Sequence, residues 1–431
     1  MASETIQPVN YDNDVECYQV KKQPVRVTKT VQKILSGIAR ILLAGTDYQI
    51  EKINMENIKS PYFIMSTHMS FNDFPISIMA TEPDPVNHIA TMVSYYRKPK
   101  IMELVGCICK RRFTQDLALI RSINHCIKKY GSVINMYPEA RYSQAGVMSV
   151  VPDSIGKIVK MQKVPLVILK SCGNYLRNPY WNHRQINRKV PIRATMTCVL
   201  TEKEIKEKSA EEIYQIIIAA LDYDEYQWQK DNKIKISHKK RATGLHKVLY
   251  QCPHCMAESR MKSHGIHVSC SACGKVWKLT EYGEMQALEG ETEFSHIPDW
   301  FRWQRKQVRE QIENGSYFFE DEVEIYSLPN PKRFISLGKG KIVHDRNGFR
   351  LNGMYRGKPF EICRLAKSMY GIHVEYNSLY VKPYDSIDLS TDHDTFYCYP
   401  KKENVVTKIS LATEELFKWW EEQRLMEENN G

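Results

Sequence analysis

Short apolar runs alternate with segments of helical periodicity through the first half of the chain. The runs at 63–65, 132–136 and 164–169 each predict a buried strand, because they are brief and bounded by polar residues, glycine or proline. Between them, residues 116–129 carry apolar side chains at helical spacing, and Gly131 is a suitable stop. Strands that alternate with helices predict an α/β domain whose functional side chains lie at strand ends.

Two further helices are predicted from their patterns. Residues 209–221 should begin at Ser209 as the N-cap, with Glu212 three residues later completing a capping box. Residues 28–42 form an amphipathic pattern with basic flanks. This second helix has two readings: a core-facing helix, which we favour, or a helix that docks on a membrane surface.

The pattern changes in the second half of the chain. Lysine and arginine crowd residues 233–247, which makes this segment the best domain boundary, and short β-like runs begin at about residue 317. The predicted division is a polar leader (1–27), an α/β domain (28–230), a basic connector (231–247), a paired-cysteine domain (248–285), a helical linker (286–315) and a β-rich domain closed by a helix (316–431).

Composition narrows the class of protein. The 431 residues are 42% apolar and 26% charged, which is ordinary for a soluble globular protein. The formal charge of +11 favours anionic partners such as phosphate ligands, anionic lipid or nucleic acid. The acidic first twenty residues lack the apolar core of a secretory signal, and the most apolar early stretch, 31–45, is too short and charged to span a bilayer. We therefore expect a cytoplasmic protein.

Four of the twelve cysteines form two Cys-x-x-Cys pairs, Cys252 with Cys255 and Cys270 with Cys273. Each pair makes a tight turn that presents two thiolates, and two such turns complete a tetrahedral Zn²⁺ site, so the segment resembles a zinc ribbon. Gly274 suits the positive φ that such a turn requires. Four thiolates close the coordination shell, which predicts a structural metal. A redox dithiol is the alternative, and nucleic acid is a less favoured partner of the ribbon.

A candidate catalytic pair follows the first predicted strand. The run 63–65 leads into His68, and Asp73 lies five residues later. A carboxylate beside an imidazole fixes its tautomer and stabilises the imidazolium, as a general base requires. Taken alone, a structural histidine and a helix cap would be the better interpretation.

Three later segments change that balance. Gly106 and Arg111 flank a short apolar run. Arg141 follows a Pro-Glu pair at a predicted strand end, and Pro165 stands at the head of the strand at 164–169. The four segments in this order resemble the four blocks of the glycerolipid acyltransferase family, in particular the 1-acyl-sn-glycerol-3-phosphate (lysophosphatidic acid) acyltransferases, over about residues 30–225. The matching residues are His68, Asp73, Gly106, Arg111, Glu139, Arg141 and Pro165.

The resemblance implies an acyltransferase α/β domain with a mixed sheet, and direct acyl transfer from a thioester to a hydroxyl. His68 would take the proton of the acceptor hydroxyl, and Asp73 would hold the imidazole. Arg111 and Arg141 would bind the acceptor phosphate, and Glu139 would orient an arginine or a glycerol hydroxyl. A serine relay is not expected, since the Gly-x-Ser-x-Gly elbow of serine hydrolases is absent from the sequence.

The third block departs from the common Phe-Pro-Glu-Gly-Thr-Arg form. Tyr137 replaces the phenylalanine, Ala140 replaces the glycine, and Arg141 comes one residue early. Alanine lacks the easy access of glycine to positive φ, which predicts a differently shaped loop and bears on the choice of acceptor.

The function implied is transfer of a fatty acyl group from acyl-CoA or acyl carrier protein to 1-acyl-sn-glycerol 3-phosphate, giving phosphatidic acid. The enzyme would act peripherally at the inner face of the membrane, with a structural Zn²⁺. Two alternatives stay open: an acyltransferase for another lyso-lipid or for glycerol 3-phosphate, and a non-catalytic module that binds lipid or nucleic acid through the ribbon.

Overall fold

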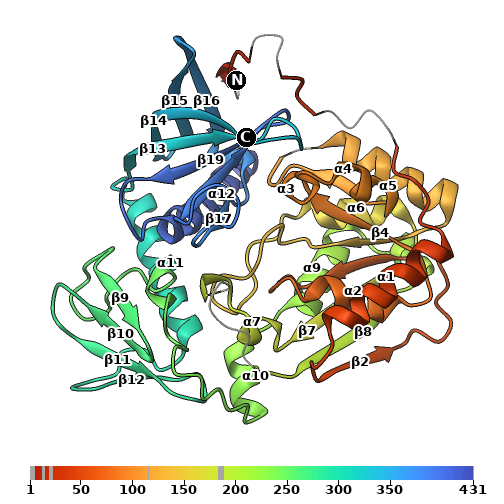
Figure 1. The fold of residues 1–431 in the computed structure, drawn as a ribbon, viewed down its shortest axis with the longest axis horizontal. Helices are drawn as coiled ribbons and strands as arrows, with labels where there is room; N and C mark the ends of the chain where they lie inside the picture. Colours follow the sequence, from red (N-terminus) through yellow and green to blue (C-terminus); the bar gives the residue numbers. More distant parts are fainter. Residues whose placement is uncertain (1–4, 12–14, 19–22, 115, 183–188, 431) are drawn as a thin grey trace. The chain divides into compact units, whose positions relative to one another are not determined.

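The computed structural model divides the chain into two compact units (Figure 1). The α/β unit consists of residues 20–110 and 116–236, and the β-rich unit consists of residues 1–19, 111–115 and 237–431. The residues described are 5–11, 15–18, 23–114, 116–182 and 189–430.

A seven-stranded sheet with strand order β2-β8-β7-β3-β6-β4-β5 forms the centre of the α/β unit. Neighbouring strands are parallel except β7 and β8, so the predicted mixed sheet is confirmed. The strands are β2 (Tyr48–Ile53), β3 (Phe63–Ser66), β4 (Val86–Thr91), β5 (Ile108–Lys110), β6 (Val133–Met136), β7 (Leu166–Cys172) and β8 (Ile192–Leu200).

Helices cover both faces of this sheet. Phe63 and Met65 of β3 pack into a cluster with α5, α6 and α9, whereas Ile64 packs into a second cluster with α2. A strand buried on both faces is apolar along its whole length, which explains the run that marks β3 in the sequence. The helices are α1 (Lys29–Leu42), α2 (Asp73–Thr81), α3 (Met92–Tyr95), α4 (Pro99–Leu104), α5 (Leu117–Tyr130), α6 (Ser154–Gln162), α7 (Asn174–Arg177), α8 (Glu202–Glu207), α9 (Ala210–Leu221) and α10 (Glu225–Asp231).

Two predicted helix ends are confirmed. Ser209 and Glu212 form the capping box of α9, and Gly131 ends α5 in the left-handed conformation. Among the described helices, none combines the length and the apolar character that a membrane crossing would need.

The β-rich unit contains an eight-stranded antiparallel sheet, a four-stranded sheet and two long helices, as the pattern of short runs predicts. The larger sheet has the order β1-β16-β15-β14-β13-β19-β18-β17, and the smaller has the order β12-β11-β10-β9. The elements are β1 (Thr5–Gln7), β9 (Met261–His264), β10 (His267–Cys270), β11 (Val276–Leu279), β12 (Met285–Ala287), α11 (Ile297–Glu313), β13 (Phe319–Ser327), β14 (Ile335–Asp345), β15 (Gly348–Tyr355), β16 (Lys358–Leu365), β17 (His373–Glu375), β18 (Ser386–Ser390), β19 (Thr395–Pro400) and α12 (Val406–Asn430).

Two segments are placed differently from the sequence expectation. The leader is not merely polar and loose, because β1 pairs with β16 and Tyr11 is buried against Ser327. Residues 111–115 interrupt the predicted α/β domain and group with the β-rich unit. Local hydrophobic periodicity does not report such long-range pairings, because it is a property of neighbouring residues.

Candidate active site and metal centre

The end of strand β3 is anchored at two points on its neighbouring strands. Ser66 Oγ donates to Asn135 Oδ1 on β6 at 2.7 Å, and the Ser171 amide of β7 donates to Thr67 Oγ1 at 3.0 Å. The Thr67 amide in turn donates to the Leu169 carbonyl. The residue that follows, His68, is therefore delivered from a fixed backbone at the carboxyl end of a central strand, where ligand sites of open α/β sheets are found.

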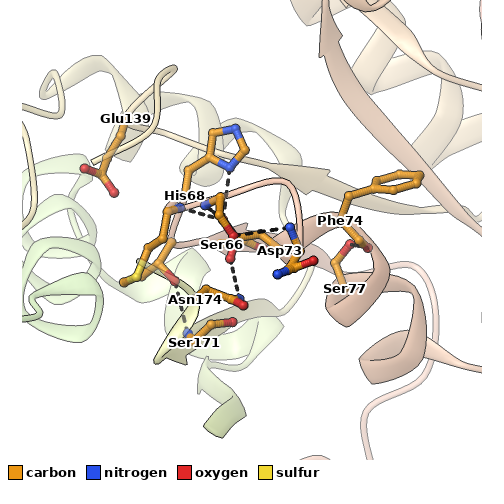
Figure 2. A network of polar contacts seen from close by, with 12 residues as sticks. Ser66, His68, Asp73, Phe74, Ser77, Glu139, Ser171 and Asn174 are labelled. Carbon is orange, nitrogen blue, oxygen red and sulfur yellow. Dashed lines mark hydrogen bonds and ion pairs between the residues drawn. The ribbon is translucent and has the colours of Figure 1, made fainter. Parts of the chain in front are cut away.

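His68 and Asp73 form the predicted pair (Figure 2). His68 Nδ1 lies 3.3 Å from Asp73 Oδ2, and the same oxygen accepts from the Met69 amide at 2.5 Å and the Ser70 amide at 2.9 Å. Asp73 is buried at the first turn of α2, where the helix dipole favours a carboxylate. The His68 side chain is 21% exposed. A buried anion thus orients an imidazole that solvent or substrate reaches.

Two tyrosine rings lie against the imidazole of His68. Tyr137 stacks on it with ring centroids 4.0 Å apart, and Tyr142 lies tilted at 4.3 Å. The Ser143 amide donates to the His68 carbonyl at 2.9 Å, which ties this loop to the histidine. Aromatic faces attract cations, so the rings would favour the imidazolium that forms when His68 takes a proton. Tyr142 has no signature in the sequence that would have marked it.

Glu139 is buried and holds its own loop. Its carboxylate accepts from the Ser149 amide at 2.8 Å, from Ser149 Oγ at 2.9 Å, and from the Tyr223 hydroxyl. Burial raises the pKa of Glu139 to about 7, against the lowering effect of the Ser149 bonds and the charge of Arg141. Arg141 is also buried and lies close enough to influence Glu139. The expectation that Glu139 orients an arginine or a glycerol hydroxyl stays a prediction.

Burial of Glu139 should make the folded chain less stable as the pH rises. Its pKa is about 7 in the folded chain against an ordinary 4.5, so the folded state binds the proton more tightly. The contribution of Glu139 to stability is then greatest below about pH 4.5 and falls by roughly 3 kcal/mol as the pH rises through 7. Urea unfolding at pH 5 and pH 8 should show a smaller difference for Glu139→Gln than for the parent. Glu225, whose pKa burial raises to about 8, adds a slope of the same sign to both proteins. Equal differences in the two proteins would contradict this prediction.

The turn after Glu139 adopts positive φ in spite of its alanine. Ala140 has φ of 55°, and its amide donates to the Tyr137 carbonyl at 3.0 Å. Ala140 therefore adopts the positive φ for which glycine is usually required, and the expectation of a differently shaped loop stays a prediction. For a residue other than glycine this conformation costs about 1–2 kcal/mol.

Gly106 is a close-approach position within the α/β unit. It has φ of 69°, and a Cβ there would lie 2.5 Å from Val27 Cγ2 and 2.6 Å from Asn87 Nδ2. Its carbonyl accepts from Asn87 Nδ2 at 2.6 Å. The positive φ and the side chains packed against its Cα explain the glycine.

Arg111 has its hydrogen-bond partners among residues of the β-rich unit. It belongs to the β-rich unit, where its guanidinium donates to the carbonyls of Leu328 at 3.1 Å and Pro329 at 2.8 Å, and to Thr395 Oγ1 at 3.0 Å. The residue is 6% exposed. These bonds indicate a structural role for Arg111 within its unit, and the phosphate contact expected from its position in the second block stays a prediction.

Replacing Arg111 by alanine should therefore lower the free energy of unfolding by about 2–4 kcal/mol, because two buried carbonyls and a hydroxyl lose their donor. Denaturant unfolding of the whole chain is the measurement. Arg111→Lys is the matched control, since it keeps the charge but cannot reproduce the planar fork, and it should recover only part of the loss. A weaker apparent affinity for a phosphate-bearing acceptor, at unchanged stability, would instead restore the sequence-based assignment.

The four predicted cysteines meet in the β-rich unit. The Sγ atoms of Cys252, Cys255, Cys270 and Cys273 all lie within 4.8 Å of one another, beside the four-stranded sheet. Cys252 Sγ is 3.8 Å from Cys273 Sγ, and Cys255 Sγ is 3.7 Å from Cys270 Sγ. A tetrahedral ion with bonds of about 2.3 Å to sulfur requires sulfur separations of about 3.8 Å, so the donor set fits Zn²⁺.

The two cysteine turns have the same backbone form. The Met256 amide donates to the Cys252 carbonyl at 3.0 Å, and the Gly274 amide donates to the Cys270 carbonyl at 2.9 Å. Met256 and Gly274 both have positive φ, 64° and 79°. The sequence indicated this only for Gly274, because methionine carries no signal for the left-handed region.

A second group of possible ligands lies on β17 and β18. His373 Nε2 is 3.0 Å from Glu375 Oε1 and 3.8 Å from Asp388 Oδ2, and all three residues are buried. Arg112 donates to Asp388 Oδ2 at 3.2 Å. Because the arginine already balances one carboxylate, we assign no metal to this group.

No protein-family model and no curated protein matches this chain. Among solved structures it is similar to the 1-acyl-sn-glycerophosphate (LPA) acyltransferase PlsC from Thermotoga maritima, with 16% sequence identity and a TM-score of 0.35. The match covers 44% of this chain and 77% of that chain. The likeness is weak, so a functional proposal has to rest on the residues of this chain.

Proposed function

We propose that the α/β unit is an O-acyltransferase that moves an acyl group from a thioester to a hydroxyl. The observation that carries the proposal is the His68–Asp73 pair, in which a buried carboxylate with two backbone donors faces a partly exposed imidazole at the end of β3. In the sequence this pair is followed by three further segments that resemble the acyltransferase blocks, and for this reason acyl transfer is the reaction proposed.

The geometry supports a single-step mechanism. Asp73 can only accept, so His68 donates Nδ1–H to it and Nε2 carries the lone pair. Nε2 would take the proton of the acceptor hydroxyl while the hydroxyl oxygen attacks the thioester carbonyl, forming the ester bond. The carbon–sulfur bond breaks, and His68 returns the proton to the departing thiolate. Ser66 is an unsuitable nucleophile, because its hydroxyl donates to Asn135.

For the acceptor we propose 1-acyl-sn-glycerol 3-phosphate, with acyl-CoA or acyl carrier protein as donor and phosphatidic acid as product. Arg141, buried beside Glu139, is the cation assigned to the phosphate, since Arg111 is engaged elsewhere. Glycerol 3-phosphate or another lyso-lipid is the alternative acceptor, and it uses the same base.

The proposal is tested by incubating the purified chain with palmitoyl-CoA and a panel of acceptors, and measuring free CoA and esterified lipid. Lysophosphatidate should give the highest kcat/KM, and lysophosphatidylcholine the lowest, because the latter lacks a phosphomonoester. Ester formation with glycerol 3-phosphate alone would replace the acceptor but keep the chemistry. Absence of ester with every acceptor, with both acyl-CoA and acyl carrier protein as donors, would overturn the proposed function.

For the cysteine cluster we propose a structural Zn²⁺ within a zinc ribbon. Cys252, Cys255, Cys270 and Cys273 would all be ligands, leaving no open position for substrate. The ion would supply folding energy to the small sheet of β9–β12.

Membrane attachment is proposed through α1. One face of this helix is buried through Leu35 and Ala39, as the core-facing reading predicts. The other face leaves Ile34 58% exposed, Ile38 47% exposed and Ile41 76% exposed. Exposed isoleucines beside basic side chains of the same helix fit an anionic lipid surface. On this ground we propose the inner face of the membrane as the location of the protein.

Charged substitutions on this face should weaken lipid binding. Ile38→Glu combined with Ile41→Glu should reduce sedimentation with phosphatidylglycerol vesicles by at least about tenfold, since each isoleucine contributes about 1.5 kcal/mol or more when buried in lipid. Leu117→Glu is the control, because Leu117 is 73% exposed but belongs to α5. Equal binding of the double variant and the parent would exclude α1 as the docking element.

A further inference from the structure

The segment that follows β7 places the side-chain amide of Asn174 against Asp73, the carboxylate partner of the candidate base His68. Asn174, the first residue of α7, donates from Nδ2 to Asp73 Oδ1 at 2.7 Å, and its exposure is 0% (Figure 2). The two residues are 101 positions apart in the chain. They meet because β7 lies beside β3 in parallel.

The two oxygens of Asp73 have separate partners. Oδ2 receives the Met69 and Ser70 amides and faces His68 Nδ1. Oδ1 accepts a hydrogen bond from Nδ2 of Asn174. With donors on both oxygens, the carboxylate plane is fixed and Oδ2 stays directed at His68.

Asn174 is itself held rigidly. The Gly173 amide donates to the carboxylate of Glu225 at 2.8 Å, and a Cβ on Gly173 would lie 2.1 Å from the Pro191 carbonyl oxygen. Gly173 has φ of 91°, so both its conformation and its surroundings require glycine. The backbone that carries Asn174 therefore has little freedom to move away from Asp73.

The oxygen of the same side-chain amide does not contribute a hydrogen bond to stability. Asn174 Oδ1 is buried and has no hydrogen-bond partner among the residues that the structure describes. A buried polar atom without a partner is costly, and an apolar side chain would avoid that cost. The amide at position 174 is better explained by the hydrogen bond that its Nδ2 donates to Asp73.

We propose that Asn174 is a positioning residue of the acyl transfer, which fixes the carboxylate of Asp73 so that His68 is held as the general base. This inference rests on the proposed function of the α/β unit. Asn174 acts through Asp73 and His68, and no contact with substrate is implied.

An aspartate at position 174 offers a pH-dependent readout. In its protonated form a carboxyl group can donate to Asp73 Oδ1 as the amide does, whereas the ionised form repels Asp73. The charged and titratable groups that face this position are Asp73, His68, Tyr137 and Glu225. Two of them are carboxylates, so the new acid would keep its proton to a higher pH than usual.

The experiment measures kcat and KM of Asn174→Ala and Asn174→Asp from pH 6 to pH 9, with palmitoyl-CoA and the best acceptor. Asn174→Ala should lower kcat about 10- to 100-fold at all pH values, with KM changed less than about threefold, as expected for misalignment of a base. Asn174→Asp should retain more activity than Asn174→Ala at pH 6 and lose it as the pH rises, giving an alkaline decline beyond any that the parent shows. Asn178→Ala, one turn further along, is the control, because Asn178 also has a buried Oδ1 without a partner in the described structure but makes no recorded contact with Asp73.

A kcat of Asn174→Ala within twofold of the parent, or parallel pH profiles for Asn174→Asp and the parent, would overturn the positioning role. If Asn174→Ala does not fold, as judged by circular dichroism, the pH profile of Asn174→Asp decides. His68→Ala is assayed in parallel. Absence of ester formation by the parent would refute the proposed function itself, and turnover of His68→Ala within about tenfold of the parent would refute His68 as its base, whereas a strongly impaired His68→Ala beside unaffected Asn174 variants would refute only the positioning role.

Discussion

Replacing His68 by alanine is expected to lower kcat for acyl transfer by about 10²–10⁴-fold, the usual contribution of a general base. The imidazole is the one basic group that the structure holds at the end of β3 with a fixed tautomer, among the residues described. Because its side chain is only 21% exposed and packs against Tyr137 and Tyr142, its removal should also lower the free energy of unfolding by about 1–2 kcal/mol, so turnover is compared on folded protein. Single-turnover release of CoA is the measurement.

Asp73→Asn is the informative partner of that variant. The Met69 and Ser70 amides require an acceptor where Oδ2 lies, so the introduced amide would keep its oxygen towards His68 Nδ1, and the negative charge that stabilises the imidazolium would be lost. We expect a loss in kcat comparable to that of His68→Ala, although the shape of the side chain is kept. If His68→Ala keeps its turnover within about tenfold of the parent, another group is the base, and the assignment of both residues fails.

The pair of His68 and Asp73 could be predicted from the sequence because its geometry is local. The two residues are five positions apart, and the strand before them and the helix that begins at Asp73 each follow from short-range pattern. Asn174 and Tyr142 could not be predicted in this way. Asn174 meets Asp73 only through the order of strands in the sheet, which places β7 next to β3.

Arg111 shows the opposite limit of a sequence motif. Its position two residues before Phe113 and five after Gly106 matches the second block, yet its hydrogen-bond partners are 217 to 284 residues away. A guanidinium suits buried carbonyls as well as phosphate, since both offer oxygen acceptors. The residue type and spacing are therefore compatible with either role, and only the placement of residues 111–115 separates them.

The cysteine pairs fall between these cases. Each Cys-x-x-Cys turn is local, and the meeting of the two turns could be inferred because four thiolates have a common use. The conformation of Met256 could not be inferred: it adopts the same positive φ as Gly274, at the equivalent place in the other turn. Positive φ is strained for methionine. The cysteines of the turn would hold Met256 in this conformation.

Replacing Cys270 by serine should remove the bound zinc and unfold the four-stranded sheet. Cys270 ends β10, is 1% exposed and lies 3.7 Å from Cys255 Sγ, so serine would leave three thiolates around a poorer ligand. Structural zinc contributes about 10–16 kcal/mol in isolated ribbon-like peptides, and a loss of several kcal/mol is expected here. Metal analysis should give about one zinc per chain for the parent and far less for the variant.

Limited proteolysis locates the effect of that substitution. New cleavage should appear between residues 250 and 290, because the strands β9 to β12 pair only with one another within the described sheets. Cys363→Ser is the matched control, since Cys363 is a half-buried thiol on β16 of the same unit and should change neither zinc content nor cleavage. A full equivalent of zinc in Cys270→Ser would place the metal on other ligands, and the buried group of His373, Glu375 and Asp388 would then be the first to mutate.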